Sequence, residues 1–139
     1  SLFNCPDKLG HGALVMLDAD GLKKINDELG HEAGDAYLKS ISEILISFNS
    51  PNCISARYGG DEFILFIHNL ENDSQVDAYL QKLADIRRET KAEVAPDKIV
   101  PIRFSFGASF LSDTLEPAAL IKNADEEMYS NKRRRKQQM

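Results

Sequence analysis

Four acidic side chains occur in two pairs, and each pair adjoins an apolar run. Asp18 and Asp20 follow one run, and Asp61 and Glu62 precede another. If the two runs form neighbouring strands, the carboxylates meet at one edge of a sheet, where their repulsion is costly unless a cation binds. Mg²⁺ suits such a site because it prefers oxygen ligands and completes its octahedron with water and phosphate. Exposed acids of a solvated β-hairpin are the alternative interpretation.

The runs beside these acids have the features of strands. Residues 13–17 are apolar throughout, as in a strand that is buried on both faces. Residues 53–58 and 62–68 flank Gly59-Gly60 and predict a hairpin whose second strand is central.

Helices are predicted around these strands. A short helix ends at Gly30 as its C-cap, and from Ala33 onward apolar residues recur every three to four positions, predicting an amphipathic helix that ends before Pro51. Residues 72–74 offer an N-cap for a third helix, and the last helix begins near Pro117.

Residues 99–110 are a further strand region, interrupted by Pro101 and Gly107. Because a tight turn joins adjacent strands, the sheet cannot be purely parallel. We therefore expect an α+β fold with a central, mostly antiparallel sheet flanked by helices. With 139 residues, 42% hydrophobic and 28% charged, residues 1–139 should form a single domain.

Composition also limits the environment and the partners. No apolar run approaches the roughly 20 residues that span a bilayer, and no secretory signal is present, so we expect a soluble, cytoplasmic domain without membrane contact. The net charge is −5, but residues 132–136 contribute +5 and leave an acidic body, which argues against nucleic-acid binding. Cys5 and Cys53 match no metal spacing and are expected to be reduced.

Four blocks of sequence carry a family resemblance. They are D-x-D-x-x-K-x-x-N-D-x-x-G-H-x-x-G-D at 18–35, RYGGDEF at 57–63, FSFGAS at 104–109 and ADEEMYSNK at 124–132. In this order they resemble the GGDEF domain of diguanylate cyclases. The resemblance implies a fold similar to the polymerase palm and the class III nucleotidyl cyclases. It also implies condensation of two GTP molecules into cyclic di-GMP, with release of two pyrophosphates, across a homodimer.

The resemblance assigns the acids to two-metal catalysis. It implies that Asp18 and Asp61, with the backbone carbonyl of Ala19, ligate two Mg²⁺ ions, with Mn²⁺ as a possible substitute. Asp61 would also help to deprotonate the attacking 3′-hydroxyl, and Glu62 would support the metal site.

The triphosphate contacts come from other matching positions. Lys23 would act on the phosphates during catalysis, and Lys132 and Lys136 would reach the distal phosphates from the last helix. Lys136, preceded by Arg135, replaces the arginine usual in the family, so the charge is kept without the guanidinium fork. Glycines 59 and 60 would let phosphates approach the backbone.

Asn26, His31 and Asp35 match the nucleoside-contacting positions. A carboxylate can accept from the N–H donors of guanine, and an amide can donate to its acceptor. Adenine cannot satisfy this pair of groups. The alternative is that Asn26 and Asp35 cap helices and that His31 is a packed turn residue.

Three departures from the family pattern have consequences. Gly21-Leu22 replaces an aromatic pair and loosens the expected phosphate loop, and residues 50–53 (SPNC) lack the RxxD motif through which product inhibits. The usual lead-in is missing before residues 1–10, so the chain is expected to be a fragment with an upstream sensory or linker domain. An active cyclase is the first hypothesis, and a catalytically weak or inactive GTP-binding regulatory module is the second.

Overall fold

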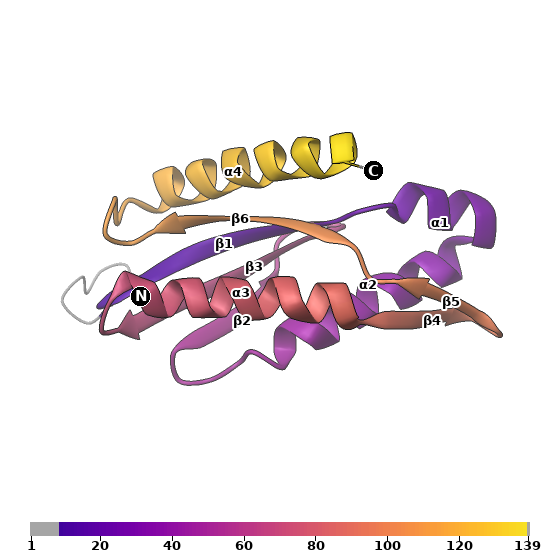
Figure 1. The fold of residues 1–139 in the computed structure, drawn as a ribbon, viewed down its shortest axis with the longest axis horizontal. Coiled ribbons are helices and arrows are strands. Elements are labelled where there is room, and N and C mark those ends of the chain that lie inside the picture. The colour runs from indigo at the N-terminus through magenta and orange to yellow at the C-terminus, as the bar shows by residue number, and fades with distance from the viewer. Residues whose placement is uncertain (1–8, 139) are drawn as a thin grey trace.

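The computed structural model describes residues 9–138, with side chains up to residue 135. Cys5, most of the lead-in and the side chain of Lys136 therefore lie outside the described part. The elements, in chain order, are β1 (His11–Ala19), α1 (Leu22–Leu29), α2 (His31–Ile46), β2 (Cys53–Arg57), β3 (Glu62–Leu70), α3 (Asp73–Glu89), β4 (Lys91–Ala95), β5 (Lys98–Pro101), β6 (Phe104–Phe110) and α4 (Pro117–Gln138) (Figure 1).

The main sheet has the strand order β2-β3-β1-β6, and each of these pairings is antiparallel. Leu17 of β1 is in register with Phe63 of β3 on one side and with Phe106 of β6 on the other. The α+β class and the adjacency of the two acid-bearing strands are therefore confirmed. The predicted central position of β3 is confirmed as well, since β3 pairs on both sides.

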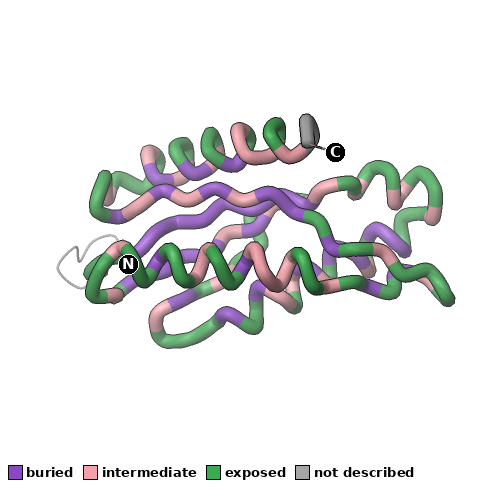
Figure 2. The backbone as a smooth tube through the Cα atoms, in the orientation of Figure 1, coloured by how far each residue is buried: buried purple, intermediate pink, exposed green. Residues whose placement is uncertain are grey.

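Helices cover both faces of this sheet, with α4 on one face and α2 and α3 on the other (Figure 1). Val15 and Leu17 of β1 belong to the cluster under α2 and α3, whereas Leu14 and Met16 belong to the cluster under α4. Every β1 residue after His11 is buried, as the unbroken apolar run predicts (Figure 2).

The prediction that Gly107 interrupts a strand is wrong, because β6 runs through it. A Cβ at Gly107 would lie 2.2 Å from the backbone nitrogen of Met128 on α4. The glycine is required because helix and strand backbones approach closely here.

The strand region predicted at 99–110 is two elements rather than one. β5 leaves the main sheet and pairs with β4 in a separate two-stranded sheet that packs against α2. β4 was not predicted, since only Ala92 and Val94 of its five residues are buried apolar positions. Pro101 ends β5 and separates it from β6.

The helix boundaries follow the predicted signals closely. Gly30, at φ 94° and ψ 166°, ends α1 as expected and also precedes α2, which begins at His31 and not at Ala33. Asn72 caps α3 by accepting from the Gln75 N–H at 3.1 Å. No helix among the described residues has the length and apolarity that a membrane crossing requires.

Candidate functional site

Antiparallel pairing of β1 and β3 brings the two acidic groups together. Asp18 is in register with Glu62, and the Ala19 N–H donates to the Asp61 carbonyl at 3.0 Å. Asp18 is only 8% exposed. The interpretation as solvated hairpin acids is therefore wrong for Asp18, which is buried in the central strand.

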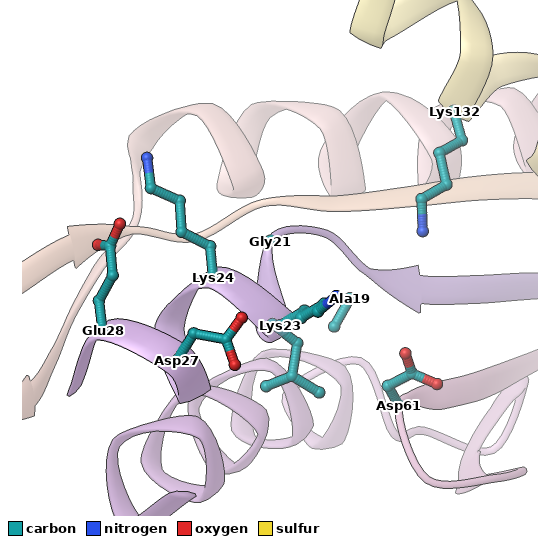
Figure 3. Close-up of a pocket in the computed structure, with 9 residues that line it drawn as sticks. Ala19, Gly21, Lys23, Lys24, Asp27, Glu28, Asp61 and Lys132 are labelled. Carbon is teal, nitrogen blue, oxygen red and sulfur yellow. The ribbon is translucent and has the colours of Figure 1, made fainter. Parts of the chain in front are cut away.

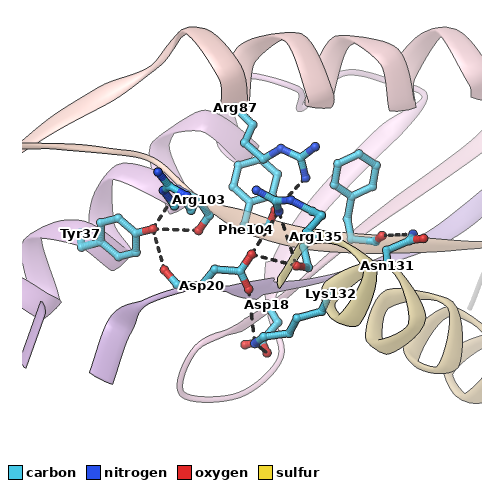
Figure 4. A network of polar contacts seen from close by, with 11 residues as sticks. Asp18, Asp20, Tyr37, Arg87, Arg103, Phe104, Asn131, Lys132 and Arg135 are labelled. Atoms are coloured by element: carbon cyan, nitrogen blue, oxygen red, sulfur yellow. Dashed lines mark hydrogen bonds and ion pairs between the residues drawn. The ribbon is translucent and has the colours of Figure 1, made fainter. Parts of the chain in front are cut away.

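The C-terminal part of helix α4 lies at this end of the sheet and supplies cations (Figure 4). The Lys132 ammonium lies 2.7 Å from Asp18 Oδ2 and 3.3 Å from Asp20 Oδ1. Arg135 lies 3.1 Å from Asp20 Oδ2, which also accepts from the Ser105 hydroxyl at 2.8 Å. Asp20 therefore faces α4 and is held by two cations.

Burial and mutual repulsion shift the pKa values of the side chains gathered here. Burial raises the pKa of Asp18, the Lys132 ammonium partly offsets this, and the charge of Asp61 raises it further. Burial also raises the pKa of Glu62, assisted by the charges of Asp18 and other nearby acids. Burial lowers the pKa of Lys132, but the hydrogen bond and charge of Asp18 outweigh it, so that this pKa is raised.

The donor set fits a hard divalent cation. Asp18 Oδ1 is buried and has no hydrogen-bond partner among the described residues. The charge of Asp61 raises the pKa of Asp18, so the two carboxylates lie near each other, and a divalent cation would relieve their repulsion. Among the side chains that the structure describes, no three His, Cys, Asp or Glu residues are grouped closely enough to hold a metal ion by themselves.

A cleft of about 640 Å³ opens beside these acids (Figure 3). Its lining residues are Ala19, Gly21, Leu22, Lys23, Lys24, Asp27, Glu28, Asp61 and Lys132. We call it the nucleotide cleft. Lys23 from α1 and Lys132 from α4 thus line the same cleft as Asp61. Gly21, at φ 76°, begins α1 without a side-chain cap, which leaves the first N–H groups of that helix available at the cleft.

The three predicted nucleoside contacts lie beyond this lining. Asn26 Oδ1 rests against Gly34 of α2, where an added Cβ would lie only 1.8 Å away. Asp35, the next residue of α2, is exposed, and so is His31. Neither α1 nor α2 has a side-chain cap at its start, and His31 is an exposed helical residue, so the capping and packed-turn alternatives are wrong.

The hairpin turn does not need its glycines for folding. A Cβ at Gly60 would meet nothing within 4 Å, and neither Gly59 nor Gly60 has a positive φ. Arg57 braces the turn by donating to the carbonyls of both glycines, to that of Gly59 at 3.2 Å. The sequence offered no specific signal for this role of Arg57.

Tyr37 of α2 is a second residue that sequence reasoning missed. Its buried hydroxyl lies 2.8 Å from the carbonyl oxygens of Asp20 and Arg103 and accepts from the Arg103 N–H at 2.8 Å. It joins the loop after β1 to the start of β6 and so fixes the backbone at Asp20. Only its place on the apolar face of the helix was visible in the sequence.

Residues 50–53 form a tight turn in which Ser50 and Cys53 exchange backbone hydrogen bonds at 3.0 and 3.2 Å. The Asn52 amide donates to the carbonyls of His68 and Asn69, and Cys53 is buried. No guanidinium or carboxylate is present in this turn.

Comparisons with known proteins converge on one family. The family model described as "Diguanylate cyclase, GGDEF domain" matches residues 3–138. Diguanylate cyclase A of Treponema denticola is 32% identical over 123 residues, which cover 86% of this chain and 32% of that protein. The chain therefore spans about a third of the length of this curated relative.

Solved structures give the same result. The GGDEF domain of YfiN from Pseudomonas aeruginosa matches with a TM-score of 0.83 and 28% identity, covering 90% of this chain and 78% of that one. The active GGEEF domain of a diguanylate cyclase from Vibrio cholerae matches with a TM-score of 0.73 and 25% identity, covering 90% and 78%.

Proposed function

We propose, because this chain belongs to the GGDEF domain family of diguanylate cyclases, that it condenses two GTP molecules into cyclic di-GMP and releases two pyrophosphates. The observation that carries the proposal is the pairing of β1 with β3, which brings Asp18 near Asp61, a residue that lines a cleft together with Lys23 and Lys132. That arrangement joins a cation site to a site for phosphates.

Diguanylate cyclases of this family generally use divalent metals, and we propose Mg²⁺, with Mn²⁺ as a substitute. Asp18, the Ala19 carbonyl and Asp61 would hold two ions. When bound, the metal would lower the pKa of the 3′-hydroxyl and neutralise charge at the α-phosphate. Asp61 would accept the 3′-hydroxyl proton as the oxygen bonds to the α-phosphorus and pyrophosphate departs, and Glu62 would support the metal site.

The remaining groups would bind and orient GTP. Lys23, Lys132 and Lys136 would neutralise the triphosphate, while Gly60 and its neighbour Gly59 leave the backbone open to a phosphate. Asn26 and Asp35 would complement the guanine edge, with His31 nearby on α2. The support for this pocket is the close approach of the Asn26 amide to Gly34, the residue that precedes Asp35 in α2.

Two copies of the domain are required by the product. One nucleotide cleft holds one GTP, whereas cyclic di-GMP contains two phosphodiester bonds between two nucleotides. Two domains would therefore face each other with twofold symmetry, each 3′-hydroxyl aimed at the opposite α-phosphate. We further propose that the domain works in the cytoplasm, where GTP and Mg²⁺ are supplied, under an upstream sensory or linker domain.

The test is incubation of the purified domain with GTP and Mg²⁺ at a series of protein concentrations, followed by chromatographic detection of cyclic di-GMP. Product formation per molecule should rise with protein concentration, since the active species is a dimer. GTP binding without any product, even when the domain is fused to a dimeric helix that raises its effective concentration, would overturn the cyclase assignment.

A GTP-binding regulatory module is the second candidate. It is favoured by the ion pair at 2.7 Å between Lys132 and Asp18, because an internal cation balances the acid without a metal. The same assay separates the two functions, since a regulatory module would bind GTP and form no cyclic di-GMP.

A further inference from the structure

A second charged hollow lies between α3, α4 and the start of β6. It has a volume of about 330 Å³ and is lined by Ala84, Arg87, Arg88, Pro101, Ile102, Arg103 and Arg135. Four of these residues are arginines, none is an acid, and none lines the nucleotide cleft. We call this hollow the arginine cleft.

A smaller hollow of about 250 Å³ adjoins it and shares Arg87 and Arg135 with it. The smaller hollow adds Arg134, and again no carboxylate is among its lining residues. Positive charge therefore continues past the two shared guanidiniums, which lie close together in Figure 4.

Arg87 is held by neutral groups. Its Nη1 donates to the Phe104 carbonyl at 2.8 Å, and its guanidinium lies 5.7 and 5.1 Å from the ring centres of Phe104 and Phe106. Among the ion pairs of the described residues, none joins Arg87 to a carboxylate. Aromatic faces and a carbonyl thus hold a guanidinium that keeps unused N–H donors.

The neighbouring charges do not balance it. Arg135 pairs with Asp20 at 3.1 Å, but Asp20 also pairs with Lys132 at 3.3 Å, so that one carboxylate serves two cations. Asp85 pairs with Arg88 at 2.8 Å and is not among the residues that line the cleft. Burial lowers the pKa of Arg87 to about 10, the charges of Arg135 and Arg88 add to this effect, and the charge of Asp20 opposes it.

We propose that the arginine cleft is a binding site for a compact phosphate-bearing anion, of which pyrophosphate is the simplest. Arginine forks match phosphate oxygens in pairs, and guanidiniums supplied by α3, α4 and the segment before β6 would surround the anion from three sides. The cleft is too small for a cyclic dinucleotide to be enclosed, and Ala84, Pro101 and Ile102 give it apolar walls that favour charge pairing over hydration.

The anion would come from the proposed cyclase reaction or from other phosphorylated metabolites, which share this chemistry. Isothermal titration calorimetry in EDTA, with pyrophosphate, GTP and sulfate titrated separately, distinguishes these sources. In the absence of metal, pyrophosphate should bind to the wild type with one site per chain and more tightly than sulfate. GTP binding that is tighter than pyrophosphate binding and that Arg87→Gln weakens would indicate a nucleotide rather than the free diphosphate as the ligand of this cleft.

Variants locate the site. Arg87→Gln should weaken pyrophosphate binding about tenfold or more, whereas Lys82→Gln, the same charge change on α3 outside the cleft, should leave it within about twofold. Lys23→Gln in the nucleotide cleft should also leave it unchanged. Circular dichroism checks the fold, and Arg87→Lys, which keeps the charge but not the fork, should give an intermediate affinity if Arg87→Gln is unstable.

Equal affinities for Arg87→Gln and Lys82→Gln would overturn the proposal. So would loss of binding in Lys23→Gln alone, because the anion would then occupy the nucleotide cleft. Neither result depends on cyclase activity, and the proposed function is decided separately by the product assay.

Discussion

The Lys132 ammonium lies 2.7 Å from Asp18 Oδ2, in the group of carboxylates that the proposed metal would use. The lysine is only partly buried, and it comes from a helix on the opposite side of the sheet from α2 and α3. Lysine and metal would therefore compete for the same acid, and displacement of the lysine would free its ammonium for a phosphate.

Removal of this internal cation should strengthen metal binding. We expect Lys132→Gln to bind Mn²⁺ about three- to tenfold more tightly without nucleotide, since Asp18 and Asp20 lose their competitor, and to bind GTP less tightly. Paramagnetic resonance of free Mn²⁺ measures the first effect, and the shift of melting temperature with Mn²⁺ gives a second measure. Lys24→Gln, the same change at an exposed cleft lysine, should leave Mn²⁺ affinity nearly unaltered. Identical Mn²⁺ titrations for wild type and Lys132→Gln would rule out the competition.

Asp61→Asn tests the acid on the hairpin. Because an amide can neither accept the 3′-hydroxyl proton nor neutralise a divalent cation, we expect a loss of at least ~3 kcal/mol in the barrier, on the order of 10²-fold in rate. The melting temperature should change little, since Asp61 is at a partly exposed turn. Asp77→Asn on the exposed face of α3 is the matched control. A rate above half that of the wild type would remove Asp61 from the mechanism.

Gly34→Ala tests the proposed guanine pocket, because Gly34 lies against the Asn26 amide. The new Cβ would lie 1.8 Å from Asn26 Oδ1, so the amide must leave its present position. Alanine also favours the helix by up to about 1 kcal/mol. We therefore expect GTP affinity to fall, with its preference over ATP reduced by roughly 1–3 kcal/mol, while stability is kept. Calorimetric titration with both nucleotides measures this, and Asp35→Ala should lower the same ratio. An unchanged ratio in both variants would mean that guanine is recognised elsewhere.

Burial of Cys53 predicts a pH dependence of stability. Burial raises the pKa of this thiol from 9.0 to about 11. The folded state therefore holds the thiol proton more tightly than the unfolded state. The thiol's contribution to stability is complete below pH 9.0 and is lost as the pH rises to about 11, by about 1 kcal/mol per pH unit.

Urea unfolding of Cys5→Ser and of Cys5→Ser/Cys53→Ala across this range isolates the effect. The difference in unfolding free energy between the two proteins should narrow as the pH rises. A constant difference would show that the pKa of the Cys53 thiol is the same in the folded and the unfolded state.

Local sequence signals predicted most elements that position the site. The unbroken apolar run of β1, the glycine pair before β3 and the Asn72 cap each act within a few residues, so that they appear in the sequence directly. β4 was missed because a short alternation of Ala92 and Val94 resembles an ordinary loop until a partner strand is known. Gly107 was misread because its reason, the backbone of α4, lies elsewhere in the chain.

The same distinction holds at the site. The proximity of Asp18 and Asp61 could be predicted, because pairing of the two neighbouring strands brings the end of one next to the start of the other. The contacts of Lys132 with Asp18 and of Tyr37 with Arg103 could not, since they join residues 114 and 66 positions apart and depend on how helices dock. The sequence indicates which groups are present, and helix packing determines which of them meet.

The close approach at Gly107 also has an evolutionary consequence. Met128, whose nitrogen nearly touches this glycine, is one helical turn before Lys132, and the Asn131 amide donates to the Phe106 carbonyl at 2.8 Å. The height of α4 above the sheet therefore determines how far the lysine reaches toward Asp18. A larger side chain at Gly107 would lift the helix and withdraw Lys132, the proposed phosphate contact, without altering any residue of the cleft. We therefore expect selection to preserve this glycine as strictly as a residue of the proposed site.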